Sequence, residues 1–151
     1  GRLQRVESNR ARLQLTGLDM IAADAAQLST WWDGVAFDAI LADVPCSASG
    51  VVRRHPDIKW LRRPEDIAQF AQTQMQIIEA LWQTLKVGGR MLYATCSVFK
   101  TENATQVAAF CLKHADAEQL PLPAPLPADG QLIPCAEQDG FYYALLQKNP
   151  S

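Results

Sequence analysis

The sequence predicts an α/β fold, with a mostly parallel sheet and helices on both of its faces. Strand and helix patterns alternate along most of the chain, which is typical of right-handed βαβ units. The segment FDAILAD at residues 37–43 is a nearly continuous apolar run, as buried parallel strands usually are. Polar residues and thiols directly follow the strand candidates, at the sheet edge where α/β proteins bind ligands.

Length and composition narrow the class of protein. The chain has 151 residues, of which 48% are hydrophobic and 20% charged, and these values indicate one soluble globular domain. A formal net charge of −2 argues against a protein that holds nucleic acid by bulk positive charge alone. No apolar run approaches the roughly 20 residues of a membrane helix and no secretory signal is visible, so we expect a cytoplasmic protein without a membrane partner. Four cysteines without a CxxC pair predict neither a disulfide scaffold nor a metal site.

The first elements are a helix and two strands. An amphipathic helix is predicted over residues 3–15, because apolar residues recur at helical spacing and Gly17 stands where a helix would end. No methionine precedes this helix, so we expect the chain to begin within a domain. Strands are then predicted over residues 19–23 and 37–43.

The second half of the chain is predicted to alternate in the same way. Pro64 opens a long helix, because proline fits the first turn and the acids that follow oppose the positive end of the helix dipole. Gly88 and Gly89 are predicted to end this helix. The remaining elements are, in order, a strand over residues 90–95, a helix over 102–113, an irregular proline-rich connection over 121–139 and a last strand over 140–146.

Three predicted strand ends hold the most distinctive residues. Asp24 follows the first strand, the segment DVPCSASG at residues 43–50 follows the second, and Cys96 follows the third. Because the carboxyl ends of parallel strands meet at one edge of a sheet, we expect Asp43, Cys46 and Cys96 to converge in one cleft.

Two thiols and a carboxylate suit the alkylation of a pyrimidine ring at C5. A thiolate that adds to C6 makes C5 nucleophilic, and a carboxylic acid bonded to the ring N3 and amine favours that addition. A base must then remove the C5 proton so that the thiolate can leave. Taken alone, however, Pro-Cys is as consistent with a turn that holds a buried, inert thiol.

The segments DVPCSASGVVRRHPDIKWLRR at 43–63 and LKVGGRMLYATCS at 85–97 carry a resemblance. Together with RVESNRARL, the Glu102-Asn103 pair and the terminal DGFYYALL, they resemble the Sun/Fmu (NOL1/NOP2/Sun) family of RNA cytosine-5 methyltransferases. The resemblance implies a Rossmann-like class I methyltransferase fold, S-adenosyl-L-methionine as cofactor and 16S ribosomal RNA as partner. It also implies that residues 1–151 are part of a methyltransferase domain truncated at its N-terminal side, without the glycine-rich cofactor loop and the N-terminal RNA-binding domain.

The resemblance also implies a role for each site residue. Cys96 would be the nucleophile that adds to C6 of cytosine, and Cys46 would assist product release. Asp43 would lie between the methionine end of the cofactor and the target base, and Asp24 beside the adenosine. Related enzymes that methylate DNA attack with a Pro-Cys thiol, so the residues alone would assign the attack to Cys46.

The segment RRHPDIKWLRR at residues 53–63 is strongly basic, with five Arg or Lys and one Asp. The simplest interpretation of this segment is a solvated loop. Its position directly after the Cys46 motif favours contact with an RNA backbone, for which Arg53, Arg54 and Lys59 are the best candidates. Trp60 is available to stack on a base.

Two other functions remain open. An amino methyltransferase of nucleic acid would use Asp-Val-Pro-Cys as a variant of the Asn/Asp-Pro-Pro-aromatic loop and would need no thiol. A non-catalytic RNA-binding module would bind RNA without turnover, which would suit a chain that lacks the cofactor loop. A truncated sheet would also expose an unpaired edge, through which copies of the chain could associate non-physiologically.

Overall fold

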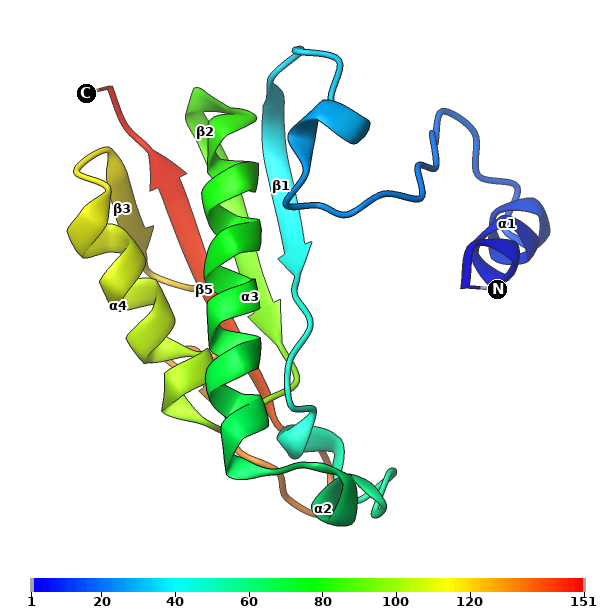
Figure 1. The fold of residues 1–151 in the computed structure, drawn as a ribbon, viewed down its shortest axis with the longest axis vertical. Coiled ribbons are helices and arrows are strands. Elements are labelled where there is room, and N and C mark those ends of the chain that lie inside the picture. Colours follow the sequence, from blue (N-terminus) through cyan, green and yellow to red (C-terminus); the bar gives the residue numbers. More distant parts are fainter. Residues whose placement is uncertain (1, 151) are drawn as a thin grey trace.

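The computed structural model describes residues 2–150, and Figure 1 shows a sheet with helices packed against it. The helices are α1 (Arg2–Arg12), α2 (Ile58–Leu61), α3 (Pro64–Gln83) and α4 (Ala104–Lys113). The strands are β1 (Phe37–Asp43), β2 (Leu85–Thr95), β3 (Ala117–Leu120), β4 (Gln131–Leu132) and β5 (Phe141–Lys148). Short 3-10 helices are η1 (Leu28–Thr30), η2 (Ser49–Val51) and η3 (Lys100–Glu102).

The sheet has the strand order β1-β2-β5-β3, and β4 pairs with β5. β1 and β2 are parallel, whereas β5 runs antiparallel to β2, β3 and β4. The α/β class is therefore confirmed, but the described sheet is mixed rather than mostly parallel. The reason is the connection between β3 and β5, which contains no helix to return the chain to the starting edge, so β5 enters in the opposite direction.

Both long helices lie on the same face of the sheet (Figure 1). β1-α3-β2 and β2-α4-β3 are successive crossovers that step in the same direction across the sheet, from β1 towards β3. Since such crossovers are right-handed, both helices must cover the same face. Helices on both faces were predicted; within residues 2–150, α3 and α4 cover one face, and α1 stands apart at the end of an extended segment (Figure 1).

The core fills the space between this helical layer and the sheet. Trp82 of α3 packs edge-on against Phe110 of α4, with ring centroids 5.2 Å apart. Strand residues that point to the same side are fully buried: Met91, Tyr93, Tyr142, Ala144 and Leu146. The core thus fixes β1 and β2 side by side, with their carboxyl ends at the same edge. No helix in the described part of the chain is long and apolar enough to cross a membrane.

Several boundaries differ from the sequence prediction. Residues 19–23 form no strand, because no neighbouring strand in residues 2–150 pairs with them. The long helix ends at Gln83 rather than at the glycine pair, since Thr84 turns the chain directly into β2. Gly88 and Gly89 instead lie in an irregular part of β2, where Gly88 has a φ of +82° and Gly89 packs against the backbone of β1.

Candidate active site

The two motif cysteines meet where the parallel strands β1 and β2 end. The Val44 N–H donates to the carbonyl of Ala94, so the two chains leave the sheet together. Cys46 and Cys96 follow on neighbouring loops, and their Sγ atoms are 3.4 Å apart. The expected convergence of Cys46 and Cys96 is therefore found in the structure.

A pocket of about 370 Å³ opens beside the thiols, on the sheet face opposite α3 and α4. The strand register places Asp43, Ala94 and Tyr143 in one row across three strands. The pocket is lined by these three residues together with Leu41, Val51, Thr95, Cys96 and Phe141. One carboxylate and one thiol thus face a mainly apolar cavity, which suits a flat ring with polar edges.

The paired thiols differ in acidity. A hydrogen bond from the Cys46 thiol lowers the pKa of Cys96 to about 7, although burial and the Asp43 and Glu102 charges oppose this. The same contact and burial raise the pKa of Cys46, whose sulfur also accepts a hydrogen bond from the Ala48 backbone N–H. Of the two thiols, Cys96 is therefore the one that ionises more readily, and the thiolate is the form that attacks carbon.

Glu102, at the end of η3, joins the two cysteine loops. Its side chain is completely buried. Oε1 accepts hydrogen bonds from the Ser47 N–H (2.8 Å) and the Gln74 side chain (3.1 Å). Oε2 accepts from the hydroxyls of Ser47 and Ser97, each at 2.6 Å. Sequence reasoning gave Glu102 no role, because an acid at the start of a predicted helix is usually a solvated residue near the helix dipole.

A second support for the Cys96 loop comes from the proline-rich connection. The Asn103 side chain donates to the Ser97 carbonyl (2.8 Å) and to Gln131 (2.8 Å), and Gln131 donates to the same carbonyl (3.2 Å). Gln131 belongs to β4, inside the segment that was predicted to be irregular. β4 is only two residues long and forms by pairing with β5, so residues 131–132 carry no strand pattern of their own.

The backbones at Gly50, Cys96 and Gly140 pack closely together beside the Cys46 loop. The Gly50 N–H donates to the Cys96 carbonyl (2.9 Å), and the Gly140 N–H donates to the Gly50 carbonyl (2.8 Å). A Cβ on Gly50 would lie 2.1 Å from the Gly140 oxygen, so only glycine fits there. This contact locks both thiol loops against the start of β5.

The basic segment 53–63 divides into two parts. Asp139 is only 2% exposed, and ion pairs to Arg54 (2.6 Å) and Arg53 (3.5 Å) compensate its charge. Arg53 also donates to the carbonyls of Cys135 and Ala136. These two arginines, predicted as RNA contacts, therefore also hold the 134–140 loop in place, although their outer surfaces remain exposed.

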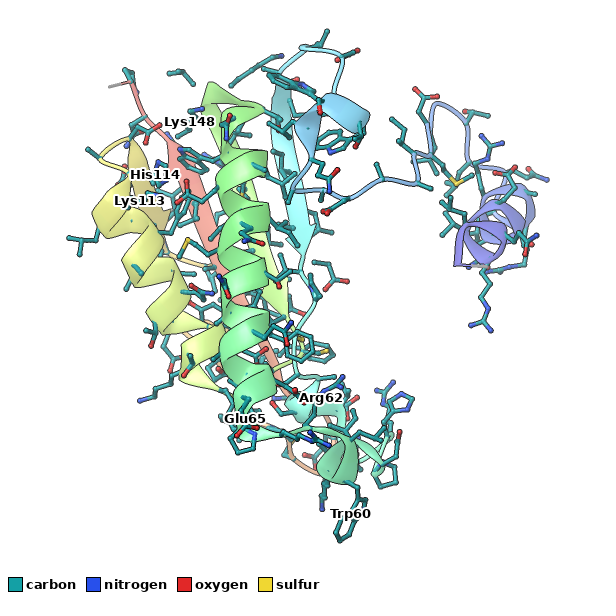
Figure 2. The ribbon with its side chains drawn as sticks, in the orientation of Figure 1. Trp60, Arg62, Glu65, Lys113, His114 and Lys148 are labelled. Carbon is teal, nitrogen blue, oxygen red and sulfur yellow. The ribbon has the colours of Figure 1, made fainter. Side chains whose placement is uncertain are left out.

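The second part of the segment is α2, which faces solvent. Lys59 is exposed and Trp60 is 88% exposed. Figure 2 shows the Trp60 ring pointing away from the body of the protein. Arg62 turns back instead: it donates to the Ser47 carbonyl (3.0 Å) and lies over the Phe70 ring. Arg62 thereby anchors α2 beside the Cys46 loop.

Asp24 is the predicted site residue that the structure does not bring to the thiols. Its side chain is exposed, and it accepts hydrogen bonds from the Ala26 N–H (3.0 Å) and the Gln27 side chain (3.3 Å). These are the contacts of a residue that stabilises its own turn. No group of His, Cys, Asp and Glu side chains in residues 2–150 is arranged to hold a metal ion.

Known sequences match this chain closely. The family described as 16S rRNA methyltransferase RsmB/F matches residues 1–147. The ribosomal RNA small subunit methyltransferase B of Vibrio cholerae is 51% identical over 148 residues, and that of Shewanella oneidensis is 48% identical over 151 residues. These alignments cover 97% of this chain and 34% and 35% of the relatives, so the chain spans about a third of their length.

Solved structures share the fold at lower identity. The crystal structure of PH0851 has a TM-score of 0.89 at 29% identity, and covers 97% of this chain and 34% of that one. NSun6 from Pyrococcus horikoshii, crystallised with SFG, has a TM-score of 0.84 at 28% identity, over 99% of this chain and 39% of that one. The similarity therefore includes the mixed sheet and the strand ends that hold the thiols.

Proposed function

The chain belongs to the RsmB/F family of 16S rRNA methyltransferases, and we propose that the protein methylates C5 of a cytosine in 16S ribosomal RNA. S-adenosyl-L-methionine would be the methyl donor and Cys96 the nucleophile. The observation that supports this proposal most strongly is the pair of thiols 3.4 Å apart beside a pocket that also holds a carboxylate. Methylation on an exocyclic amine needs no thiol, whereas methylation on C5 needs a nucleophile at C6.

Cys96 begins the reaction by adding its thiolate to C6 of the cytosine. The addition moves the electron pair of the C5–C6 double bond towards N3, so that C5 becomes nucleophilic. Cys96 lines the pocket, and a pKa of about 7 leaves about half of its sulfur ionised at neutral pH. The base would have to leave its stack to enter the pocket, as bases do in enzymes that modify them.

Asp43 has the position to bind the ring. It lies in the same wall of the pocket as Cys96, at the exposed end of β1. A carboxylate at the N3 and amino edge of cytosine accepts hydrogen bonds from the amino group and from a proton taken up at N3, and it therefore favours the electron shift that the thiolate addition requires. Asp43 would thus orient the base and favour the attack.

Cys46 assists the last step. After C5 has been methylated, a base removes the C5 proton and the bond between C6 and Cys96 breaks. Cys96 leaves as a thiolate, which accepts a hydrogen bond from the Cys46 thiol at its 3.4 Å distance. Burial and the shared contact raise the pKa of Cys46, so it stays protonated and able to donate.

The residues of the pocket fit one end of S-adenosyl-L-methionine. Asp43 is a carboxylate on a wall of mainly apolar residues, which suits an ammonium or sulfonium cation. NSun6 from Pyrococcus horikoshii, a structural neighbour, was crystallised with SFG, an analogue of this cofactor. When bound, the cofactor supplies the methyl group. Asp24 would contact the adenosine, and residues 1–151 would supply one part of the cofactor site within a larger methyltransferase domain.

The test uses a protein of the relatives' full length that carries these 151 residues at the matched position, called the full-length form below. With Cys46→Ser, release should slow, and a denaturant-stable adduct with 16S ribosomal RNA should accumulate. Adding Cys96→Ala should abolish the adduct. Cys111→Ser is the matched control, since Cys111 is also a half-buried thiol but lies on α4, and it should change nothing.

Each alternative function predicts a different result. An adduct that survives Cys96→Ala but needs Cys46 would exchange the roles of the two thiols. Continued methylation by Cys96→Ala without any adduct would indicate an amino methyltransferase. RNA binding without methyl transfer in the unmodified full-length form would indicate a binding module.

A further inference from the structure

We propose that Glu102 is a positioning residue, which holds the two thiols of the site against each other and thereby controls the reactivity of Cys96. The inference deepens the proposed function and rests on it for the role of Cys96 in methyl transfer. The geometry of the four hydrogen bonds at Glu102 supports it independently.

The carboxylate binds the residue that follows each cysteine. Ser47 is held through both its backbone N–H and its hydroxyl, and Ser97 through its hydroxyl. A fixed serine leaves the preceding cysteine little freedom, because a single peptide unit separates them. One side chain from a third element therefore sets the spacing of two sulfurs that belong to loops after different strands.

Glu102 is itself rigidly held. The Gln74 side chain of α3 donates to its carboxylate, and the Tyr93 hydroxyl of β2 donates to its backbone carbonyl at 2.6 Å. Its complete burial beneath the serines excludes contact with a base or a cofactor in the pocket. Glu102 consequently acts through the loops, and it is not a catalytic residue.

Other hydrogen bonds also join the loops. The Val98 N–H donates to the Ser49 hydroxyl (3.0 Å), and the Gly50 N–H donates to the Cys96 carbonyl. Loss of the Glu102 carboxylate should therefore loosen the thiol pair without separating the strands. This makes the role of Glu102 testable in a folded protein.

The charge of Glu102 and its positioning role act on Cys96 in opposite directions. Three groups from different elements affect the sulfur: Asp43 of β1, Cys46 of the adjoining loop and Glu102 of η3. The negative charges of Asp43 and Glu102 raise the pKa of Cys96, while the Cys46 hydrogen bond lowers it. If Glu102 were only a nearby charge, neutralising it would lower that pKa. If it positions the thiols, neutralising it weakens the Cys46 contact and raises the pKa.

The experiment compares Glu102→Gln and Glu102→Ala with Glu79→Gln in the full-length form. Glu79 is a matched carboxylate control: it joins α3 to α4 through Lys113 (2.7 Å) and His114 (2.9 Å), far along the helices from the thiol loops (Figure 2). The measurement is the rate of iodoacetamide alkylation at Cys96 as a function of pH, read on the Cys96 peptide by mass spectrometry. Circular dichroism confirms that each variant is folded.

The midpoint of alkylation should lie near pH 7 in the unmodified protein. Both Glu102 variants should raise it by about one unit or more, towards the ~8.5 of a free thiol, and Glu79→Gln should leave it unchanged. A midpoint that stays in place or falls in folded Glu102→Gln would overturn the proposal. If neither Glu102 variant folds, Ser97→Ala removes one of the anchoring hydroxyls, and an unchanged midpoint there would overturn it equally.

Methyl transfer gives a separate result. With positioning lost, kcat should fall while the KM for RNA stays the same, because Glu102 touches no substrate. If the full-length form transfers no methyl group at all but the alkylation midpoint still moves as expected, the proposed function fails and the positioning role stands.

Discussion

The low pKa of Cys96 comes from its neighbours. An ordinary thiol is mostly protonated at neutral pH, with a pKa of about 8.5. Here a second thiol donates a hydrogen bond at 3.4 Å and lowers the pKa of Cys96 to about 7, even though two carboxylates act against it. The device differs from the common Cys-His pair, because a neutral donor stabilises the thiolate without adding a positive charge to the pocket.

Methyl transfer should therefore depend on pH through Cys96. With a pKa of about 7, the thiolate fraction rises from about a tenth at pH 6 to about nine tenths at pH 8. Single-turnover methylation by the full-length form should rise about tenfold over this range. Cys46→Ala removes the hydrogen-bond donor and should move the midpoint towards pH 8.5. A profile that is flat between pH 6 and 8 would show that thiolate formation does not limit the reaction.

The same contact predicts a disulfide under oxidation. Hydrogen peroxide converts the Cys96 thiolate to a sulfenic acid, and the Cys46 thiol then displaces water to form the disulfide. Peptide mapping without reductant should find Cys46 linked to Cys96, and dithiothreitol should restore both thiols. Cys135 provides the comparison, since it is exposed and its thiol donates to Glu137 rather than to another thiol, and it should enter no intramolecular link. Sulfinic acid at Cys96 without any disulfide would show that the loops cannot bring the sulfurs into bonding distance.

At the scale of elements, the sequence predicts the strand and the helix that position the site, but it does not predict all the contacts that hold the site's loops. Local patterns predicted the strand over residues 37–43 and the start of the long helix at Pro64, and both are found. The strand ends therefore placed Cys46 and Cys96 together. Glu102 and Gln131 could not be assigned, because their partners are defined only when η3 and β4 fold against the thiol loops.

The basic segment shows the same limit. From composition alone, the arginines of residues 53–63 and Lys59 are equally good candidates for RNA contacts. The structure separates them, because Arg53 and Arg54 pair with the buried Asp139, whereas α2 presents Lys59 and Trp60 to solvent. The sequence of residues 53–63 does not reveal that its arginines pair with an acid buried in a loop far along the chain.

Substitutions in this segment should accordingly have different effects. In the full-length form, Trp60→Ala should weaken binding to a single-stranded 16S ribosomal RNA fragment about fivefold or more, because it removes a stacking surface. Lys59→Ala should also reduce the salt dependence of binding, since each phosphate contact adds about 0.7 to the slope for a single strand. Neither substitution should change the free energy of unfolding.

Arg54→Ala should lower the free energy of unfolding by about 1 kcal/mol, because it removes an ion pair from a buried carboxylate. Fluorescence anisotropy and urea unfolding separate these effects, and an unchanged affinity for Trp60→Ala would exclude α2 from the interface.

At the scale of the whole molecule, strand alternation predicted the α/β class but not the direction of the last strand. The proline-rich connection predicted an irregular segment, and only its path in space reverses β5 relative to β2. The side chains of β5 alternate strictly between the helical layer and the other face. Apolar residues therefore point to both sides of the sheet, while α3 and α4 cover only one of them.

The face opposite α3 and α4 should make this chain associate. The register places Leu41, Leu92 and Leu145 in one row across it, and Leu41 is 69% exposed. On the side away from β2, β1 also has no partner strand within residues 2–150. Contiguous apolar surface beside an unpaired strand favours pairing between copies. Sedimentation of the 151-residue chain should thus show an average mass that rises with concentration.

Leu41→Ser tests where the contact lies. It removes the most exposed leucine of the row and should reduce the association constant about tenfold or more, since burying a leucine side chain contributes about 1.5–3 kcal/mol. Leu112→Ser is the matched control, because Leu112 is 90% exposed but stands alone on the outer face of α4. Association that responds equally to both substitutions would indicate non-specific aggregation. A monomer at every concentration would mean that the exposed apolar row on this face does not drive association.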